Sequence, residues 1–128
     1  MGIRAASPTP RELPLSNRTW FNRVTLIGYL GRDPESRDIP GGQLVNLSLA
    51  TSETWTDRNG EKREWVEWHQ VAITNEMLGN LAMERLRKGS RVYIEGQLQT
   101  RRWMDDEGTE RSQVGVVVPK YGGKLIIL

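Results

Sequence analysis

Tryptophans and cations share one segment of this sequence. Trp55, Trp65 and Trp68 lie within residues 44–74, and the cations between the first two are Arg58, Lys62 and Arg63. An unpaired base can stack on an indole face for about 1 to 3 kcal/mol, while neighbouring cations can contact phosphates. These residue types predict a surface for an unpaired nucleic-acid strand, although the same tryptophans could instead pack against each other across two strands.

Groups suited to bond chemistry are few. The sequence has no cysteine and one histidine, His69, which would share a strand face with Glu67. A Glu–His pair is geometrically possible, but no G-x-S-x-G, P-loop or paired-histidine motif completes a catalytic or metal site. We therefore expect no catalytic residues, no metal ligands and no cofactor.

The elements that must position the tryptophans form one long predicted hairpin. From residue 44 to 50, apolar residues occupy alternate positions, as in a half-buried strand. Turn-forming residues follow at 57–60. On the return strand, Val71 and Ile73 share one face with His69. The other face carries Trp68, Gln70, Ala72 and Thr74. Core-type residues stop before the turn, so the hairpin should extend beyond its core and expose Trp68.

Further strands and one helix complete the pattern. Residues 23–30 alternate as a strand with a bend at Gly28, and residues 91–100 do so with a bend at Gly96. The second of these strands should point Val92, Ile94 and Leu98 inward. A second hairpin carries Trp103 and turns at residues 105–108. Asn75 can cap a helix whose core face is Met77, Leu78, Leu81, Ala82 and Leu86.

The element order indicates a fold. Five strands, with one helix between the third and fourth, match an OB-fold, which is a small Greek-key barrel. We predict an all-β protein with one helix: a five-stranded OB-fold barrel with long protruding hairpins. Residues 1–20, rich in proline, are expected to form a flexible N-terminal arm, and residues 21–128 the OB-fold domain. The apolar end, residues 125–128, should pair as a last strand or pack in a subunit contact.

Length and composition add limits. The 128 residues fit one domain with its own core. The formal net charge is only +2, so local basic surfaces matter more than total charge. Arg32 and Arg37, which follow the first strand, are candidates for phosphate contact. The absence of cysteine fits a reducing compartment. No apolar run approaches the roughly 18 residues that would span a bilayer, so we expect no membrane partner.

Four segments carry a resemblance to a known family. They are NRVTLIGYLGRDPE (22–35), NLSLATSETWTD (46–57), EWHQV (67–71) and RKGSRVYIEGQLQTRRW (87–103). In sequence and order they resemble the bacterial and mitochondrial single-stranded DNA-binding protein (SSB) family, from about residue 22 to the end of the chain. The resemblance implies a homotetramer that wraps and protects single-stranded DNA, without sequence specificity, during DNA replication, recombination and repair.

The resemblance also implies roles for individual residues. Trp55, Trp68 and Trp103 become the stacking residues, while Trp65 is additional and could add a platform or brace the hairpin. The implied phosphate contacts are Arg23, Arg58, Arg63, Lys88, Arg101 and Arg102. The implied subunit contacts include His69 and Tyr29.

Two departures from the family pattern change these expectations. Thr74 stands where the family commonly has a phenylalanine that stacks on DNA. The chain also ends without the acidic, proline-containing tip by which bacterial members recruit replication and repair proteins, so those partners do not carry over. The expected location is the bacterial cytoplasm, at the nucleoid, or alternatively the mitochondrial matrix. An OB-fold adaptor for RNA or protein stays open as the alternative function, because stacking and phosphate contacts accept either nucleic acid.

Overall fold

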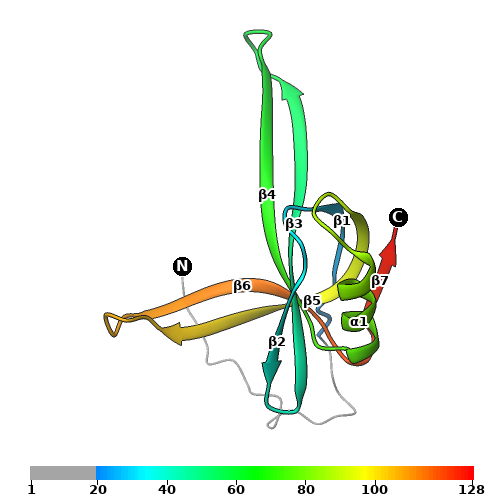
Figure 1. The fold of residues 1–128 in the computed structure, drawn as a ribbon. Coiled ribbons are helices and arrows are strands. Elements are labelled where there is room, and N and C mark those ends of the chain that lie inside the picture. Colours follow the sequence, from blue (N-terminus) through cyan, green and yellow to red (C-terminus); the bar gives the residue numbers. More distant parts are fainter. Residues whose placement is uncertain (1–19) are drawn as a thin grey trace.

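Strand pairing accounts for most of the fold in the computed structural model, which describes residues 20–128 (Figure 1). The predicted N-terminal arm therefore lies outside the described residues, apart from Trp20. The elements in chain order are β1 (Val24–Leu30), β2 (Glu35–Ile39), β3 (Gly42–Thr56), β4 (Lys62–Ile73), α1 (Glu76–Arg85), β5 (Arg91–Met104), β6 (Glu110–Val118) and β7 (Lys124–Ile127).

The sheet closes on itself as a barrel. Strands pair in the order β1-β3-β4-β6-β5, and β1 also pairs with β5, which closes the ring. The β4–β6 pairing is parallel and the other pairings are antiparallel. This is the Greek-key barrel of an OB-fold, as predicted. The five expected strands are β1, β3, β4, β5 and β6, and the structure adds β2 on β3. The apolar end forms β7 on β5, which is the last strand that the sequence offered.

Alternating apolar residues fill the barrel. Leu47, Leu49, Val71, Ile73 and Ile94 have almost no exposed surface. They occupy every second position of their strands, so one face of each strand lines the core. The predicted inward face of the long hairpin is therefore confirmed.

Two strand glycines permit close backbone approaches that close the barrel. A Cβ atom at Gly28 would lie 2.3 Å from the carbonyl oxygen of Ala50, and one at Gly96 would lie 2.4 Å from that of Val117. Any larger residue would push the paired strands apart. The two glycines at which the sequence predicted bends are thus positions where only glycine lets the paired strands approach.

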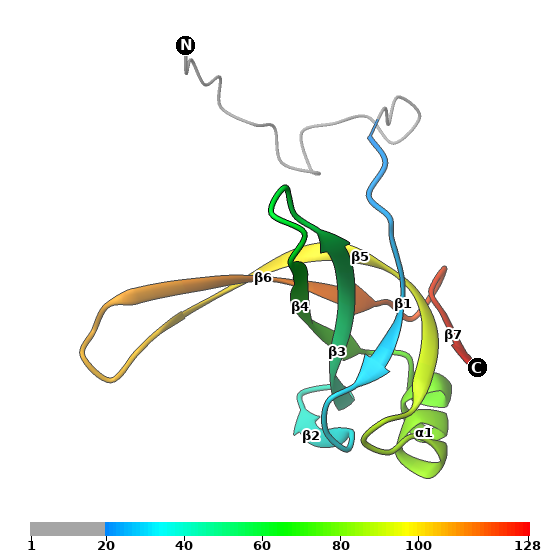
Figure 2. The same ribbon diagram turned by 90° about the horizontal axis from the view of Figure 1, so that it is seen from above.

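Two hairpins project from the barrel in different directions (Figure 1). The β3–β4 hairpin continues its pairing from Val45–Ile73 to Thr56–Lys62 without interruption. The β5–β6 hairpin pairs as far as Met104 and Glu110 and extends well clear of the barrel when seen from above (Figure 2). Each hairpin outruns the core, as the sequence predicted.

The two hairpin tips are built alike, with the spacing D-x-x-G-x-x-R in both. The Asp57 carboxylate accepts hydrogen bonds from two backbone N–H groups of its turn and from Arg63 Nε, each at 2.9 Å. Asp105 is held in the same way by its own turn and by Arg111 Nε. The backbone donors, led by Glu61 N–H at Asp57, and then the guanidinium hold the pKa of both carboxyls below their ordinary value.

Two predictions about the core were wrong. Met77 was expected on the core face of the helix, but 73% of its surface is exposed. The helix instead packs through Gly79 and Ala82. Each residue turns an α-helix by about 100°, so Met77, two residues before Gly79, lies on the side of the helix that faces away from the barrel. Leu98 was expected inside, but it is 52% exposed because β5 leaves the barrel after Gly96.

Residues 20–128 contain no helix that is long and apolar enough to span a membrane. The same residues contain no group of three or more histidines and carboxylates that could hold a metal ion.

Candidate nucleic-acid interface

The register of the β3–β4 hairpin assigns its tryptophans to two faces. Trp55 lies opposite Arg63, Glu53 lies opposite Trp65, and Ala50 lies opposite Trp68. Since directly paired residues share a face and neighbours along a strand alternate, Trp55 and Trp65 project on one side and Trp68 on the other. The sequence analysis expected Trp55, Trp65 and Trp68 to share one surface, and this expectation is wrong. The hairpin presents two separate stacking surfaces.

All four candidate stacking residues are accessible. The exposed fractions are 47% for Trp55, 61% for Trp65, 53% for Trp68 and 40% for Trp103. The Trp65 indole Nε1 also donates to Glu67 Oε1 at 3.1 Å on the same face. This bond fixes the Trp65 ring along its strand, so Trp65 can brace the hairpin and still offer a ring face.

Trp68 is positioned by a glycine far away in sequence. Gly31 follows β1, and its backbone N–H donates to Ser48 O at 2.9 Å, which brings it beside β3. A Cβ atom at Gly31 would lie 2.3 Å from Cζ3 and 2.5 Å from Cη2 of the Trp68 ring. The benzene edge of the indole thus rests directly on the Gly31 backbone. About half of the Trp68 surface, 53%, is still exposed.

Trp103 is oriented by a neighbouring cation on the β5–β6 hairpin. The Arg101 guanidinium lies over the Trp103 ring, 5.2 Å from its centroid. Both side chains are on one face of β5 because they are two residues apart, whereas Arg102 points to the other face. A cation over an indole is typically worth about 0.5 to 1 kcal/mol at an exposed site. Arg101 and Trp103 therefore form a paired cation and stacking surface.

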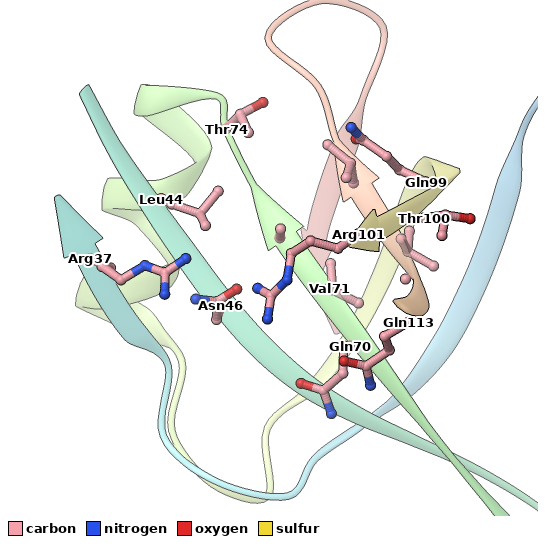
Figure 3. Close-up of a pocket in the computed structure, with 14 residues that line it drawn as sticks. Arg37, Leu44, Asn46, Gln70, Val71, Thr74, Gln99, Thr100, Arg101 and Gln113 are labelled. Atoms are coloured by element: carbon pink, nitrogen blue, oxygen red, sulfur yellow. The ribbon is translucent and has the colours of Figure 1, made fainter. Parts of the chain in front are cut away.

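A groove is lined by Gln70, which lies two residues along β4 from Trp68, and by Arg101, which lies two residues along β5 from Trp103 (Figure 3). It encloses about 250 Å³ between the outer face of β2, β3 and β4 and the base of the β5–β6 hairpin. The lining residues are two arginines, four carboxamides, two threonines and small apolar residues: Arg37, Leu44, Asn46, Gln70, Val71, Ala72, Thr74, Gln99, Thr100, Arg101, Gln113, Gly115, Val116 and Val117. No acidic side chain and no aromatic ring is among them.

Thr74 lies at one end of this groove, on the predicted outer face with Trp68. It is half-buried, and its hydroxyl donates to Val118 O at 3.2 Å. Its backbone N–H donates to the same carbonyl at 3.0 Å. These bonds hold the compact side chain against β6, so it does not fill the groove.

The predicted phosphate contacts differ in whether the cation already forms an ion pair with an acidic side chain. Arg58 is exposed at the tip of the β3–β4 hairpin, and within residues 20–128 it has no acidic partner. Arg63 instead pairs with Asp57 at 2.9 Å and with Glu61 at 3.8 Å. A phosphate at Arg63 would have to compete with both carboxylates.

Arg23 and Lys88 lie away from the groove. Arg23 pairs with Glu95, a carboxylate that is almost fully buried, at 3.3 Å, and its guanidinium also lies 5.6 Å from the Phe21 ring centroid. The Arg23 charge therefore neutralises the buried Glu95. Lys88 is exposed in the loop after α1, whose backbone is tied to the end of β1 through Asp33 and Leu30. This loop lies beside the Gly31 support of Trp68.

The two predicted subunit-contact residues lie on opposite faces of the sheet. Tyr29 pairs with Ala50 on the outer face and is exposed, whereas His69 pairs with Leu49 on the inner face and is half-buried. His69 Nε2 is 2.9 Å from Thr51 Oγ1, on the same inner face. A single flat contact therefore does not include both residues. The imidazole also already has a hydrogen-bond partner other than Glu67.

The groove carboxamides are the functional candidates that the sequence analysis did not select. Gln70 could have been found, because it shares the predicted outer face with Trp68 at a separation of two residues. Asn46, Gln99 and Gln113 come from three other strands. Only the closure of the barrel brings them together.

Comparisons with known proteins agree with this geometry. The model of the single-strand binding protein family matches residues 21–122. A similar solved structure is the Plasmodium falciparum SSB complex with ssDNA, with 33% sequence identity, a TM-score of 0.79, and coverage of 88% of this chain and 98% of that chain. A second is a deletion mutant of the single-stranded DNA binding protein from Thermus aquaticus, with 34% identity and a TM-score of 0.61. That match covers 83% of this chain and 50% of the Thermus chain.

Proposed function

Because this chain belongs to the single-strand binding protein family and binds single-stranded DNA, we propose that it wraps and protects exposed strands during DNA replication, recombination and repair. The observation that carries the proposal is the groove with two arginines in its lining, next to strand segments that carry the exposed indoles of Trp68 and Trp103. Such a surface suits a strand whose bases are unstacked and whose phosphates are charged.

In this mechanism the residues act by stacking and charge alone. Bases stack on Trp68 and Trp103 along the groove side, and Trp55 and Trp65 supply a second surface on the other face of the β3–β4 hairpin. Phosphates contact the exposed cations, with Arg101 and Arg58 the strongest candidates from their exposure and surroundings. Arg102 and Lys88 add positive charge on neighbouring surfaces. Arg63 and Arg23 contribute less because carboxylates already hold them.

Selectivity for single strands follows from base accessibility. Paired, stacked bases cannot present their ring faces to the tryptophans. Opening a duplex costs about 1.4 kcal/mol per base step, which the protein would have to supply from stacking and phosphate contacts. The protein is therefore expected to bind single strands far more tightly than duplexes of equal length.

We also propose a homotetramer, and an apolar outer face of the barrel supports an assembly. Ile27 of β1, Tyr93 of β5 and Ile126 of β7 lie side by side in register, next to exposed Tyr29. Exposed apolar residues grouped on one sheet face commonly mark protein contacts. Several copies would also let one strand run over several stacking surfaces. Light scattering that gave a monomer at micromolar concentration would contradict this part of the proposal.

The protein should do no bond chemistry. Its single histidine, His69, is hydrogen-bonded to Thr51 on the inner sheet face, away from the groove. A labelled single strand incubated with excess protein should stay intact. Residence at the nucleoid of a bacterial cytoplasm, or alternatively of a mitochondrial matrix, belongs to the same proposal.

Titration with poly(dT), followed by tryptophan fluorescence, tests the function directly. Emission should be quenched strongly, and the affinity should fall by about 0.7 log units per log unit of salt for each phosphate neutralised. Trp68→Ala and Trp103→Ala should each weaken binding without lowering the melting temperature. Duplex DNA binding as tightly as poly(dT) would contradict the stacking model. Equal or tighter binding of poly(U) would favour the RNA-binding alternative.

A further inference from the structure

The groove at the base of the β5–β6 hairpin is lined by more hydrogen-bonding groups than phosphate binding requires. Of its lining residues, four end in a carboxamide: Asn46, Gln70, Gln99 and Gln113. A carboxamide has both an N–H donor and a carbonyl acceptor. Phosphate oxygens only accept hydrogen bonds, so a phosphate would leave the carbonyl acceptor unused. The groove chemistry therefore points to a ligand that both donates and accepts hydrogen bonds.

Asn46 and Gln70 are the best placed of the four. Asn46 pairs with Ala72, and Ser48 pairs with Gln70, so Asn46 and Gln70 are diagonal neighbours on the outer face of β3 and β4. Both are half-buried. Within residues 20–128, neither carboxamide makes a hydrogen bond to another protein group. Both are therefore available to a ligand.

The shape and surroundings of the groove limit what that ligand is. A volume of about 250 Å³ lies just below the range of pockets for drug-sized ligands, so it suits one flat ring better than a stack of several. Leu44, Val71 and Val116 give it apolar walls. In Figure 3, the Arg37 and Arg101 side chains extend toward Asn46 from opposite sides. Two cations beside a small polar and apolar groove match a nucleobase with a phosphate on either side of it.

We propose that this groove takes one unstacked nucleobase, whose edge is hydrogen-bonded by the carboxamides of Asn46 and Gln70, so that the protein contacts base edges as well as base faces at one position of the strand. The proposal rests on the proposed single-strand binding, and it adds a base-edge site to the stacking surfaces. Bases before and after the bound one would stack on Trp68 and Trp103. Because Thr74 is compact and bonded to Val118, it leaves the groove open for the base.

A strand that stacks but cannot form base-edge hydrogen bonds separates the two kinds of contact. We suggest comparing an oligothymidylate with an oligonucleotide of equal length in which every thymine is replaced by its non-hydrogen-bonding isostere, difluorotoluene. Shape, stacking and phosphate charge are preserved, so the tryptophan and arginine contacts remain. The wild-type protein should bind the isostere strand about fivefold or more weakly at fixed salt, which corresponds to about 1 kcal/mol.

Variants assign the effect to the groove. Asn46→Ala combined with Gln70→Ala should bind the two strands about equally, whereas Gln43→Ala, a carboxamide on β3 outside the groove, should discriminate like wild type. Equal wild-type affinity for both strands would overturn the proposal without touching the proposed function. Discrimination that survives in the double variant would overturn the assignment to Asn46 and Gln70. Failure of wild type to bind either strand would instead refute single-strand binding. The wild-type comparison holds even if the double variant does not fold.

Discussion

Replacing Gly31 by alanine should displace the Trp68 indole and leave the fold intact. The added Cβ would lie 2.3 Å and 2.5 Å from two atoms at the far edge of the ring, well inside any real contact distance. Gly31 does not have a positive φ angle, so alanine itself fits the backbone. The clashing atoms belong to the end of an exposed side chain that can rotate. The ring should therefore move while the barrel stays as it is.

The expected loss follows from what the ring contributes. Stacking of one base on an aromatic side chain is worth about 1 to 3 kcal/mol by alanine substitution. A change of 1.4 kcal/mol in binding free energy is a tenfold change in affinity. Complete loss of the Trp68 stacking contact would therefore weaken poly(dT) binding by about 5- to 150-fold, and Gly31→Ala should weaken it by less if the displaced ring still reaches a base. The melting temperature should change little. Changes in tryptophan emission of the free protein would report the movement of the ring.

A double-mutant cycle and a glycine control test this reasoning. In a Trp68→Ala background, Gly31→Ala should cost no further affinity, because the ring that it displaces is absent. Gly28→Ala is the matched control, since its Cβ would lie at the same 2.3 Å but from a backbone oxygen, that of Ala50. That variant should lose stability. Additive losses of affinity from Gly31→Ala and Trp68→Ala would refute the support role of Gly31.

Three further changes have distinct expected results. Thr74→Phe should tighten poly(dT) binding, by up to about 1 to 3 kcal/mol, if its ring adds a stacking face at the end of the groove without filling it; a lower melting temperature with no gain in affinity would show that the site is overpacked. Arg101→Gln should weaken binding and reduce the salt slope by about 0.7, with a loss of quenching at Trp103, whereas an unchanged slope would exclude a phosphate contact. The tip of the β5–β6 hairpin should stay ordered at neutral pH, because backbone N–H donors and Arg111 lower the pKa of the Asp105 carboxyl. A carboxyl whose pKa is lowered by folding stabilises the folded tip at pH values above its ordinary pKa of 3.8, and this stabilisation is lost as the pH falls through the lowered pKa. Amide exchange at the tip should therefore rise only in acid in wild type, but already at neutral pH in Asp105→Asn.

Strand periodicity made much of the fold predictable. The alternation in residues 44–50 and the polar turn at 57–60 were enough to predict the long hairpin, its buried face and the exposure of Trp68. The cap at Asn75 was also predictable, because it depends on local chemistry: Asn75 Oδ1 accepts from Leu78 N–H at 3.0 Å, as an N-cap should. Interactions between neighbours in sequence need no knowledge of the rest of the chain.

Errors arose where two distant segments decide the outcome. Leu98 has the spacing of a core residue, but β5 has already left the barrel at that point. The phosphate contact of Arg23 stays a prediction, but the sequence could not show that this guanidinium also pairs with Glu95, 72 residues away on β5, at 3.3 Å. Neither environment can be read from the residues on either side.

The sequence by itself determined which residue types were available for stacking and charge, and on which face of its own strand each one lies. Only the tertiary structure decided which faces meet. The parallel pairing of β4 with β6 and the closure of β1 on β5 place Gln70, Asn46 and Arg101 around one groove and set Trp68 on Gly31. The physical reason is that a strand repeats every two residues and so fixes direction locally, whereas barrel closure depends on core packing between segments far apart in the chain.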